Sequence, residues 1–338
     1  MTDLLTRDRP AAGKRRGRVL PRALSTQEVV LIGVLVVLWI LLGVFTPNFL
    51  SAQSIQPLLA SAAPIALIGV GMTAVIVTAG IDISVASMLM VCAVVMAKLM
   101  VDSSWPVPLA LLAGVVVGGL CGLLNGLLIT IGGVHPIIIT FGTSNIFMFI
   151  GWRIFDSKVV NGIPTSVAWF GRGADGRFLG VPHSFLLVIV VAAALWWYMR
   201  YTAGGRHFYA IGNDQHAARL VGIRVQKRTI IPYVLTGLLV GVAALVATAN
   251  GTQTLAQSVG QGIELQAIAA VVIGGTSIVG GRGSVLGTLL GALLVQTVES
   301  GVIQLGWAPQ LAKFFVGIAI IIAVGADLLQ QRLTRRAS

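Results

Sequence analysis

Long apolar runs separated by short polar stretches dominate this chain of 338 residues. Each run is about 17 to 25 residues long, enough to cross a bilayer core of roughly 30 Å as an α-helix. Within lipid, a helix satisfies its own backbone hydrogen bonds. The pattern therefore predicts an all-α polytopic membrane protein. About ten transmembrane helices are expected, near 29–46, 55–79, 83–101, 106–130, 134–154, 184–200, 229–249, 264–280, 284–303 and 311–330.

The polar stretches define the expected organisation. A basic tail at 1–28 precedes a transmembrane domain at 29–330, and a short tail follows at 331–338. Positive charge marks the cytoplasmic side of a membrane protein. If the N-terminus is cytoplasmic, 17 of the 23 Lys and Arg residues fall on that side. Both termini and the segment 205–228 are therefore expected in the cytoplasm, and the loop 155–184 outside.

Composition agrees with this picture and excludes several functions. Only 10% of the residues are charged, whereas soluble proteins carry about 25%, and the mean hydropathy is +0.93. The net charge of +12 follows from membrane orientation, so no nucleic-acid partner is expected. The four histidines and two cysteines show no metal-ligand spacing, and neither a catalytic triad motif nor a GxxxxGK[ST] phosphate loop occurs. The chain is expected to be no enzyme, with no cofactor or metal of its own.

Two predicted spans carry glycines at every fourth residue. This spacing places small residues on one helix face, where two backbones can approach closely in lipid. Helix packing is the simpler interpretation, and a pore lining stays open as the alternative. The residues are Gly114, Gly118, Gly122 and Gly126 in one span, and Gly283, Gly287 and Gly291 in the other.

A short internal repeat indicates two related halves. The letters GIDI at 80–83 correspond to GIEL at 262–265, and each stretch precedes a span and then a glycine-spaced helix. Five predicted spans separate the two copies, so the second copy is inverted relative to the first. Inverted-topology halves are a common transporter architecture, although a match of four residues also arises by chance.

Polar residues within apolar runs are candidates for a substrate path, because polar groups at membrane depth are costly. The candidates are Asp82, Ser84, Asn125, Thr143, Asn145 and Glu264. For Asp82 and Glu264, which lie at predicted span ends, helix capping is the favoured interpretation and a place in the substrate path is the alternative.

A polar stretch at 205–228 interrupts the apolar pattern on the expected cytoplasmic side. Either Asn213 or Asp214 is suited to begin a short helix and Gly222 to end it. So short a helix is unstable alone in water, and amphipathic helices commonly bind in grooves of other proteins. A docking helix with Ala217, Leu220 and Val221 on one face and Arg219 on the polar side is predicted; a solvated basic loop is the alternative.

Four of these stretches together resemble membrane permeases of bacterial ABC sugar importers, of the ribose permease type. They are AGIDISVASM at 79–88, GVHPIIITFGT at 133–143, GRHFYAIGNDQHAARLVGI at 205–223, and GIELQAIAAVVIGGTSIVGGRGSVLGTLLGALL at 262–294. The resemblance implies an inner-membrane subunit that pairs with a second permease and two cytoplasmic ATPase domains, which bind ATP and magnesium. A periplasmic binding protein delivers the sugar. The segment at 214–222 would be the coupling helix that contacts the ATPase.

One departure concerns the substrate. Ala86 follows Val85 where the ribose-type pattern usually has glycine, and GVHPIIITFGT is closer to a branch that imports rhamnose or autoinducer-2. This leaves both an identical and a related second permease open. The rival function is an ion-coupled secondary transporter of small polar solutes, which would need charges in its span centres. A multispanning membrane enzyme is a more distant alternative.

Overall fold

A computed structural model describes residues 25–171, 176–251 and 253–337 of the chain. Most of the predicted N-terminal tail, part of the predicted outer loop and Ser338 therefore lie outside the described residues. The helices are α1 (Thr26–Phe45), α2 (Ala52–Val77), α3 (Val85–Val101), α4 (Val107–Gly132), α5 (Pro136–Phe155), α6 (His183–Tyr201), α7 (Ala203–Asn213), α8 (Gln215–Leu220), α9 (Val225–Ala249), α10 (Ile263–Ile273), α11 (Val285–Gln304) and α12 (Gln310–Ala337).

The described helices agree with an all-α polytopic protein. Seven of them, α1, α2, α4, α5, α6, α9 and α11, are long and apolar enough to cross a membrane, and α3, α10 and the first part of α12 are shorter apolar helices. These ten correspond to the ten predicted spans. The prediction is wrong for 264–280, because α10 has only 11 residues and ends before Gly274 and Gly275. Gly275 has φ +91°, a conformation that suits glycine and interrupts a helix.

Helix starts follow local sequence signals. Ser25 caps α1 through a capping box, in which its hydroxyl accepts from the Glu28 N–H (3.2 Å) and the Glu28 carboxylate accepts from the Ser25 N–H (2.6 Å). Pro136 occupies the first position of α5 after His135, where a missing N–H has no cost. The structure extends α12 to Ala337, so the described part of the predicted tail, 331–337, continues that helix.

The central helix is α2, which is buried almost throughout, whereas α1, α4, α5 and α6 keep much of their surface exposed. Its contacts explain this position, because α2 packs against α9, α11, α10 and α6. Helices that are apolar all round are suited either to a protein core or to lipid. Here α2 forms the core, and the exposed apolar faces of α1, α4 and α5 are suited to lipid or to other subunits.

The glycine-spaced helices lie at backbone-to-backbone contacts. A side chain at Gly118 or Gly122 would collide with the carbonyl oxygens of Gly237 or Tyr233 in α9, respectively. The other predicted glycines also face close neighbours. Gly114 faces Met96 of α3, Gly126 faces Ile230 of α9, Gly283 faces Val77 and Thr276, Gly287 faces Gly274, and Gly291 faces Ala270 of α10.

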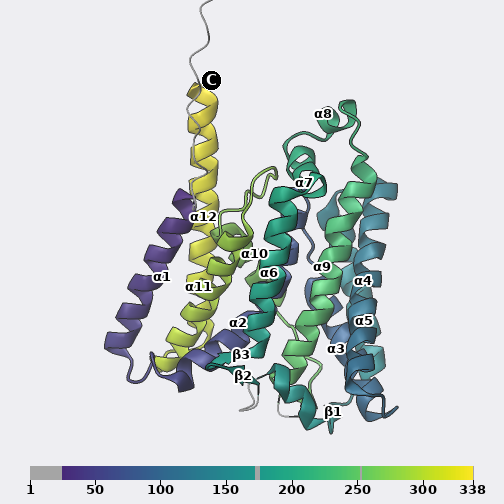
Figure 1. Ribbon diagram of the computed structural model, residues 1–338, viewed down its shortest axis with the longest axis vertical. Helices are drawn as coiled ribbons and strands as arrows, with labels where there is room; N and C mark the ends of the chain where they lie inside the picture. Colours follow the sequence, from purple (N-terminus) through teal and green to yellow (C-terminus); the bar gives the residue numbers. More distant parts are fainter. Residues whose placement is uncertain (1–24, 172–175, 252, 338) are drawn as a thin grey trace, which may run out of the picture.

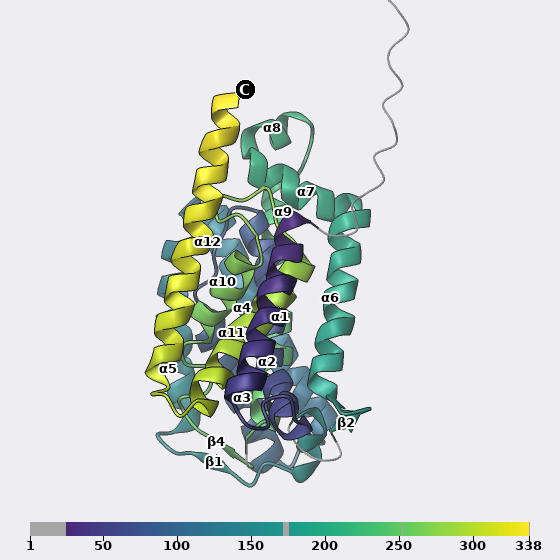
Figure 2. The same cartoon turned by 90° about the vertical axis from the view of Figure 1, so that its left-hand side faces the viewer.

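The two ends of the molecule differ in character (Figure 1, Figure 2). At one end α8 and the C-terminus project beyond the helices, and the short strands lie at the other end. There β1 (Val160–Asn161) pairs with β4 (Thr254–Leu255), and β2 (Arg177–Phe178) pairs with β3 (Val181–Pro182), next to the 3-10 helix η1 (Thr165–Phe170). The part of the predicted outer loop that the structure describes therefore lies opposite α8.

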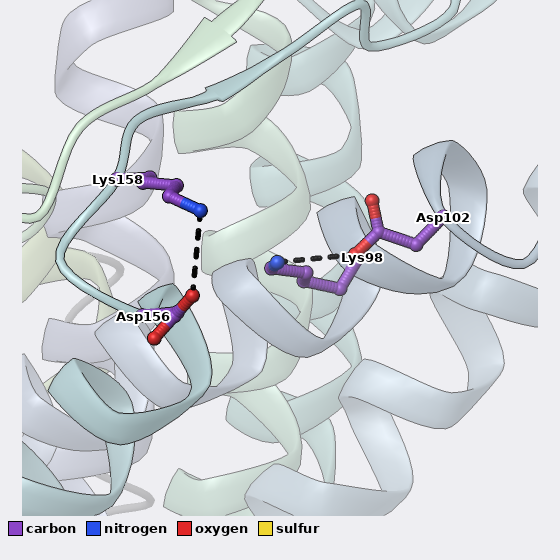
Figure 3. A network of polar contacts seen from close by, with 4 residues as sticks. All are labelled: Lys98, Asp102, Asp156 and Lys158. Atoms are coloured by element: carbon purple, nitrogen blue, oxygen red, sulfur yellow. Dashed lines mark ion pairs between the residues drawn. The ribbon is translucent and has the colours of Figure 1, made fainter.

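Two ion pairs lie close together near the strands (Figure 3). Lys98 contacts Asp102 at the end of α3 (3.0 Å), and Lys158 contacts Asp156 just after α5 (3.6 Å). Both pairs are partly or largely exposed, and exposed pairs contribute only about 0–1 kcal/mol each. Both lysines belong to the basic residues that the expected orientation leaves outside or near the outer ends of spans.

Helix contacts agree with two inverted halves. In one half α3 packs against α4 and α5, and in the other half α10 packs against α11 and α12. Across the halves, α2 packs against α11 and α9 packs against α4. Equivalent helices run in opposite directions because five crossings separate them. The helices α1 and α6 depart from this symmetry, since α1 packs mainly on α11 and α6 mainly on α2.

Candidate functional site

Four of the predicted substrate-path residues form one buried hydrogen-bond network. Asp82 is 0% exposed and accepts from the Ser84 hydroxyl (2.6 Å) and the Ser84 N–H (2.9 Å). Asn125 of α4 donates to the Ser84 hydroxyl (2.7 Å) and, at longer range, to Asp82 (3.4 Å). The Thr143 hydroxyl of α5 donates to the side-chain amide oxygen (Oδ1) of Asn125 (2.7 Å). The network therefore joins the α2–α3 connection to two other helices.

A fifth residue, Thr140 of α5, also binds the α2–α3 connection. The Thr140 hydroxyl lies 3.2 Å from both the Ile83 N–H and the Ile81 carbonyl oxygen. Buried polar groups are stable in a membrane when their hydrogen bonds are made within the protein. Because Asp82 is wholly buried and well supplied with donors, its geometry favours a structural role in holding the α2–α3 connection.

Replacing Asn125 with leucine tests this structural role. The substitution leaves Asp82 and the Thr143 hydroxyl without a shared partner, and each such loss costs about 1–3 kcal/mol. We expect a lower thermal unfolding temperature for the detergent-solubilised protein. Thr130→Val is the matched control, because the Thr130 hydroxyl bonds only to carbonyl oxygens of its own helix, such as that of Gly126 (2.7 Å). Equal unfolding temperatures for Asn125→Leu and the wild type would contradict the structural role.

The two remaining candidates, Asn145 and Glu264, line a different space. This lateral cavity has a volume of 460 Å³ and lies between α3, α5 and the connection from α9 to α10. Asn145 is exposed and donates to the Phe141 carbonyl oxygen (2.8 Å). Among the described residues, the Oε2 atom of Glu264 is buried without a hydrogen-bond partner. The structure thus separates the six candidates into a closed network of four and a cavity lined by two.

Sequence reasoning missed a second polar cavity at the end of the molecule that carries the strands. This outer cavity has a volume of 760 Å³ and is bounded by the start of α2, the ends of α9 and α11, and the start of α10. Its polar lining comprises Gln53, Ser54, Ser61, Asn250, Gln261, Gln266, Gln296, Glu299, Ser300 and Gln304. The signal in the sequence is the glutamines and serines at the ends of otherwise apolar runs, in AQSIQ at 52–56 and QTVESGVIQ at 296–304.

Hydrogen bonds hold several of these side chains in place. Gln266 donates to Glu299 (3.2 Å), and Gln304 donates to the Ser300 hydroxyl (3.0 Å). Amides and hydroxyls both donate and accept hydrogen bonds. A cavity lined mainly by such groups is suited to a neutral solute that carries several hydroxyls.

The predicted docking helix is α8, at the opposite end. Asp214 is its N-cap and accepts from the N–H groups of His216 (2.7 Å) and Ala217 (3.0 Å), whereas Asn213 ends the preceding helix α7. These hydrogen bonds, with that of Ala217 the stronger cause, lower the pKa of Asp214 below its usual value. The cap is therefore present at neutral pH and is lost only as the pH falls through that lowered pKa.

The end of α8 is a Schellman motif. The Gly222 N–H donates to the Arg219 carbonyl oxygen (3.0 Å), and the Ile223 N–H donates to that of Ala218 (3.0 Å). Gly222 has φ +83°, the left-handed conformation that this motif requires and that glycine adopts without strain. Ala218 is the buried residue of α8 and packs against Ile223 and neighbouring apolar residues. The helix therefore packs on the rest of the protein mainly through this one small side chain.

The predicted apolar face of α8 points away from the rest of the chain. Leu220 is 83% exposed and Val221 is 77% exposed, and Ala217 is exposed as well. The helix before it, α7, was not predicted. It packs against α2, α6 and α9, so the segment 205–228 is a helical unit rather than a loop with one helix.

A many-spanning helical protein with polar cavities among its helices and a projecting helix at one end is typical of membrane transport proteins. Residues 54–324 match the family described as branched-chain amino acid transport system / permease component. The chain belongs to this family of transport permeases, and it is a multi-pass membrane protein.

The chain is also similar over most of its length to several permeases. It is 37% identical to the ribose import permease protein of Bacillus subtilis over 295 residues, which cover 87% of this chain and 90% of that protein. It is 34% identical to the D-allose transport system permease protein of Escherichia coli over 301 residues, covering 88% and 90%. A probable ABC transporter permease protein of Sinorhizobium fredii is 33% identical over 301 residues, covering 89% of each chain.

Proposed function

We propose that this chain is the transmembrane permease subunit of an ATP-driven ABC importer for a monosaccharide or sugar-like molecule. The observation that carries the proposal is similarity over nearly nine-tenths of the chain to import permeases for ribose and D-allose. The outer cavity, whose lining is rich in amides and hydroxyls and includes the carboxylate of Glu299, supports it, because the hydroxyl groups of a sugar pair with such groups.

The energy for transport is proposed to come from two ATPase domains, which belong to other chains and bind ATP and magnesium. α8 supports this assignment, because Leu220 and Val221 are large apolar residues left exposed beyond the apolar helices. An exposed amphipathic helix is suited to a groove in a partner protein. The end that carries α8 and the C-terminus is proposed to be cytoplasmic, in the inner (plasma) membrane, since basic residues concentrate there.

α7 provides a physical connection between α8 and both halves of the molecule. The Tyr209 hydroxyl of α7 donates to the Gly283 carbonyl oxygen (3.2 Å) in the α10–α11 connection. In the same region the Gly281 N–H donates to the Val77 carbonyl oxygen (2.9 Å) at the end of α2. A side chain at Gly212 would collide with both Val77 and Gly281. A displacement of α8 by the ATPase is therefore expected to move the end of α2 and the α10–α11 connection together.

The outer cavity is the proposed entrance for sugar released by a periplasmic binding protein. It lies at the end opposite α8, as an importer requires if its ATPase is on the cytoplasmic side. A second permease subunit, either identical or related, is proposed to complete the passage. The exposed apolar faces of α4 and α5 leave surface for such a partner as well as for the lipid bilayer.

Uptake by the complex purified through a tag on this chain, reconstituted into vesicles with its binding protein, tests the proposed function. We expect uptake of radiolabelled ribose or allose that requires ATP and is indifferent to proton and sodium gradients. A gradient-driven uptake without ATP would favour the secondary transporter instead. Uptake of neither sugar, with ATP hydrolysis stimulated by another solute class, would contradict the assignment to sugars.

A further inference from the structure

Asn145 occupies an unusual place for an exposed amide. It lies midway along the 20 residues of α5, yet its side chain is exposed in the chain. An amide that faces lipid at this depth loses its hydrogen bonds to water, and the bond from Asn145 to the Phe141 carbonyl oxygen (2.8 Å) uses a single N–H of the amide, so full exposure to lipid is costly. Polar residues at mid-membrane are tolerated where they line a water-filled space. The lateral cavity, which Asn145 lines, offers a space of this kind beside α5.

The rest of the lining mixes polar side chains with apolar and aromatic ones. Ser87 and Ser144, whose hydroxyls are 2.9 Å apart, lie beside Asn145, and Gln261 and Glu264 face them from the α9–α10 connection and α10. Trp152, which is 50% exposed, lies two helical turns from Asn145 on the same face of α5. The volume of 460 Å³ falls within the range of roughly 300–1,000 Å³ typical of small-molecule sites.

Both copies of the internal repeat border this cavity. Ile83 belongs to the first copy, and Gly262 and Glu264 belong to the second. In inverted-repeat transporters, substrate sites form near the bilayer midplane where the two halves and their interrupted helices meet. The cavity lies between the start of α3, the start of α10 and the middle of α5, a placement that agrees with such a site.

From this placement we propose that the lateral cavity is a mid-membrane binding station for a neutral monosaccharide. The hydroxyls and amides of Ser144, Asn145 and Gln261 pair with sugar hydroxyls, and the Trp152 ring covers an apolar C–H face of the sugar ring. None of the described residues that line the cavity is basic, and Glu264 adds a carboxylate. The site therefore excludes phosphorylated and other anionic sugars. The assignment rests on the proposed function and adds a location and a charge class to it.

Single cysteines test the proposal in the intact complex, after Cys92 and Cys121 are replaced with alanine. Asn145→Cys is expected to react several-fold faster with a hydrophilic thiol reagent than Ile146→Cys. Ile146 is the matched control, because it is its neighbour on α5, is 56% exposed, and does not line the cavity. Ribose or allose is expected to slow the reaction at Asn145→Cys and leave that at Ile146→Cys unchanged. Ribose 5-phosphate is expected to give no protection.

Adding Trp152→Ala to the Asn145→Cys background is expected to raise the ribose concentration for half-protection about tenfold, the effect of one lost aromatic contact. Equal reactivity at the two cysteines, or protection unaffected by Trp152→Ala, would overturn the binding station. If ATP-driven sugar uptake persists in that case, the proposed function stands and only the station fails. Protection without ATP-driven uptake would support the station and contradict the importer.

Discussion

Replacing Leu220 with aspartate is expected to uncouple the permease from its ATPase without unfolding the transmembrane helices. Leu220 is 83% exposed on α8 and is proposed to bury in a groove of the ATPase. A charge in that desolvated contact costs about 3 kcal/mol or more, which corresponds to at least about 100-fold weaker binding. ATP hydrolysis should lose its response to sugar-loaded binding protein, and the ATPase should no longer copurify with the tagged chain.

Arg219→Ala is the matched comparison on the same short helix. Arg219 is exposed, and an ion pair at the rim of an interface contributes about 0–1 kcal/mol, so uptake should fall only slightly. Size-exclusion profiles of both variants in detergent report whether the transmembrane helices have folded. Normal copurification and normal uptake by Leu220→Asp would show that α8 is a solvated segment without a partner.

The sequence predicted α8 well because its signals are local. Asp214 and Gly222 mark the two ends of the helix, and the capping bonds span only two to five residues. The preceding α7 has a weaker set of signals, chiefly the N-cap Thr202, whose hydroxyl accepts from the Gly205 N–H (3.0 Å). Gly204, Gly205 and Gly212 disfavour a helix, and these residues form one because α7 packs against α2, α6 and α9. Tertiary contacts of that kind leave no trace in a single sequence.

The candidate site was likewise predictable only in part. The apolar pattern alone located the apolar segments. It placed Asp82 at the end of one predicted span and Asn125 within another. Their grouping could not be predicted, because the two residues are 43 positions apart and meet only when α4 packs beside the α2–α3 connection. The outer cavity could not be predicted for a related reason. Its glutamines and serines come from the ends of several helices, and each one alone is typical of a span boundary.

The sequence predicted the glycine spacing in α4, but it did not predict which helix packs against these glycines. The structure supplies α9, in which Gly237 lies directly opposite Gly118. Each glycine faces the carbonyl oxygen of the other, so the two backbones are in contact. This geometry supports the packing interpretation of the glycine stripe, because a face in backbone contact with another helix leaves little room to line a pore.

Replacing Gly118 with alanine or leucine is therefore expected to damage assembly of the protein before it alters substrate choice. The collision with the Gly237 carbonyl oxygen already begins at Cβ, so alanine should be nearly as harmful as leucine. Overpacking costs about 1–3 kcal/mol where side chains can adjust. A backbone carbonyl cannot adjust in this way. We therefore expect the free energy of unfolding to fall by about 3 kcal/mol or more, with a low yield of monodisperse protein.

Gly33→Leu is the matched control, because Gly33 lies in the spanning helix α1 with nothing within 4 Å of an added Cβ. Its yield and thermal unfolding temperature should equal those of the wild type. Fluorescence-detected size-exclusion profiles and thermal unfolding in detergent measure both variants. The result that contradicts packing is a Gly118→Leu complex with normal yield and stability but a changed preference between ribose and allose, since only a residue that borders the passage has that effect.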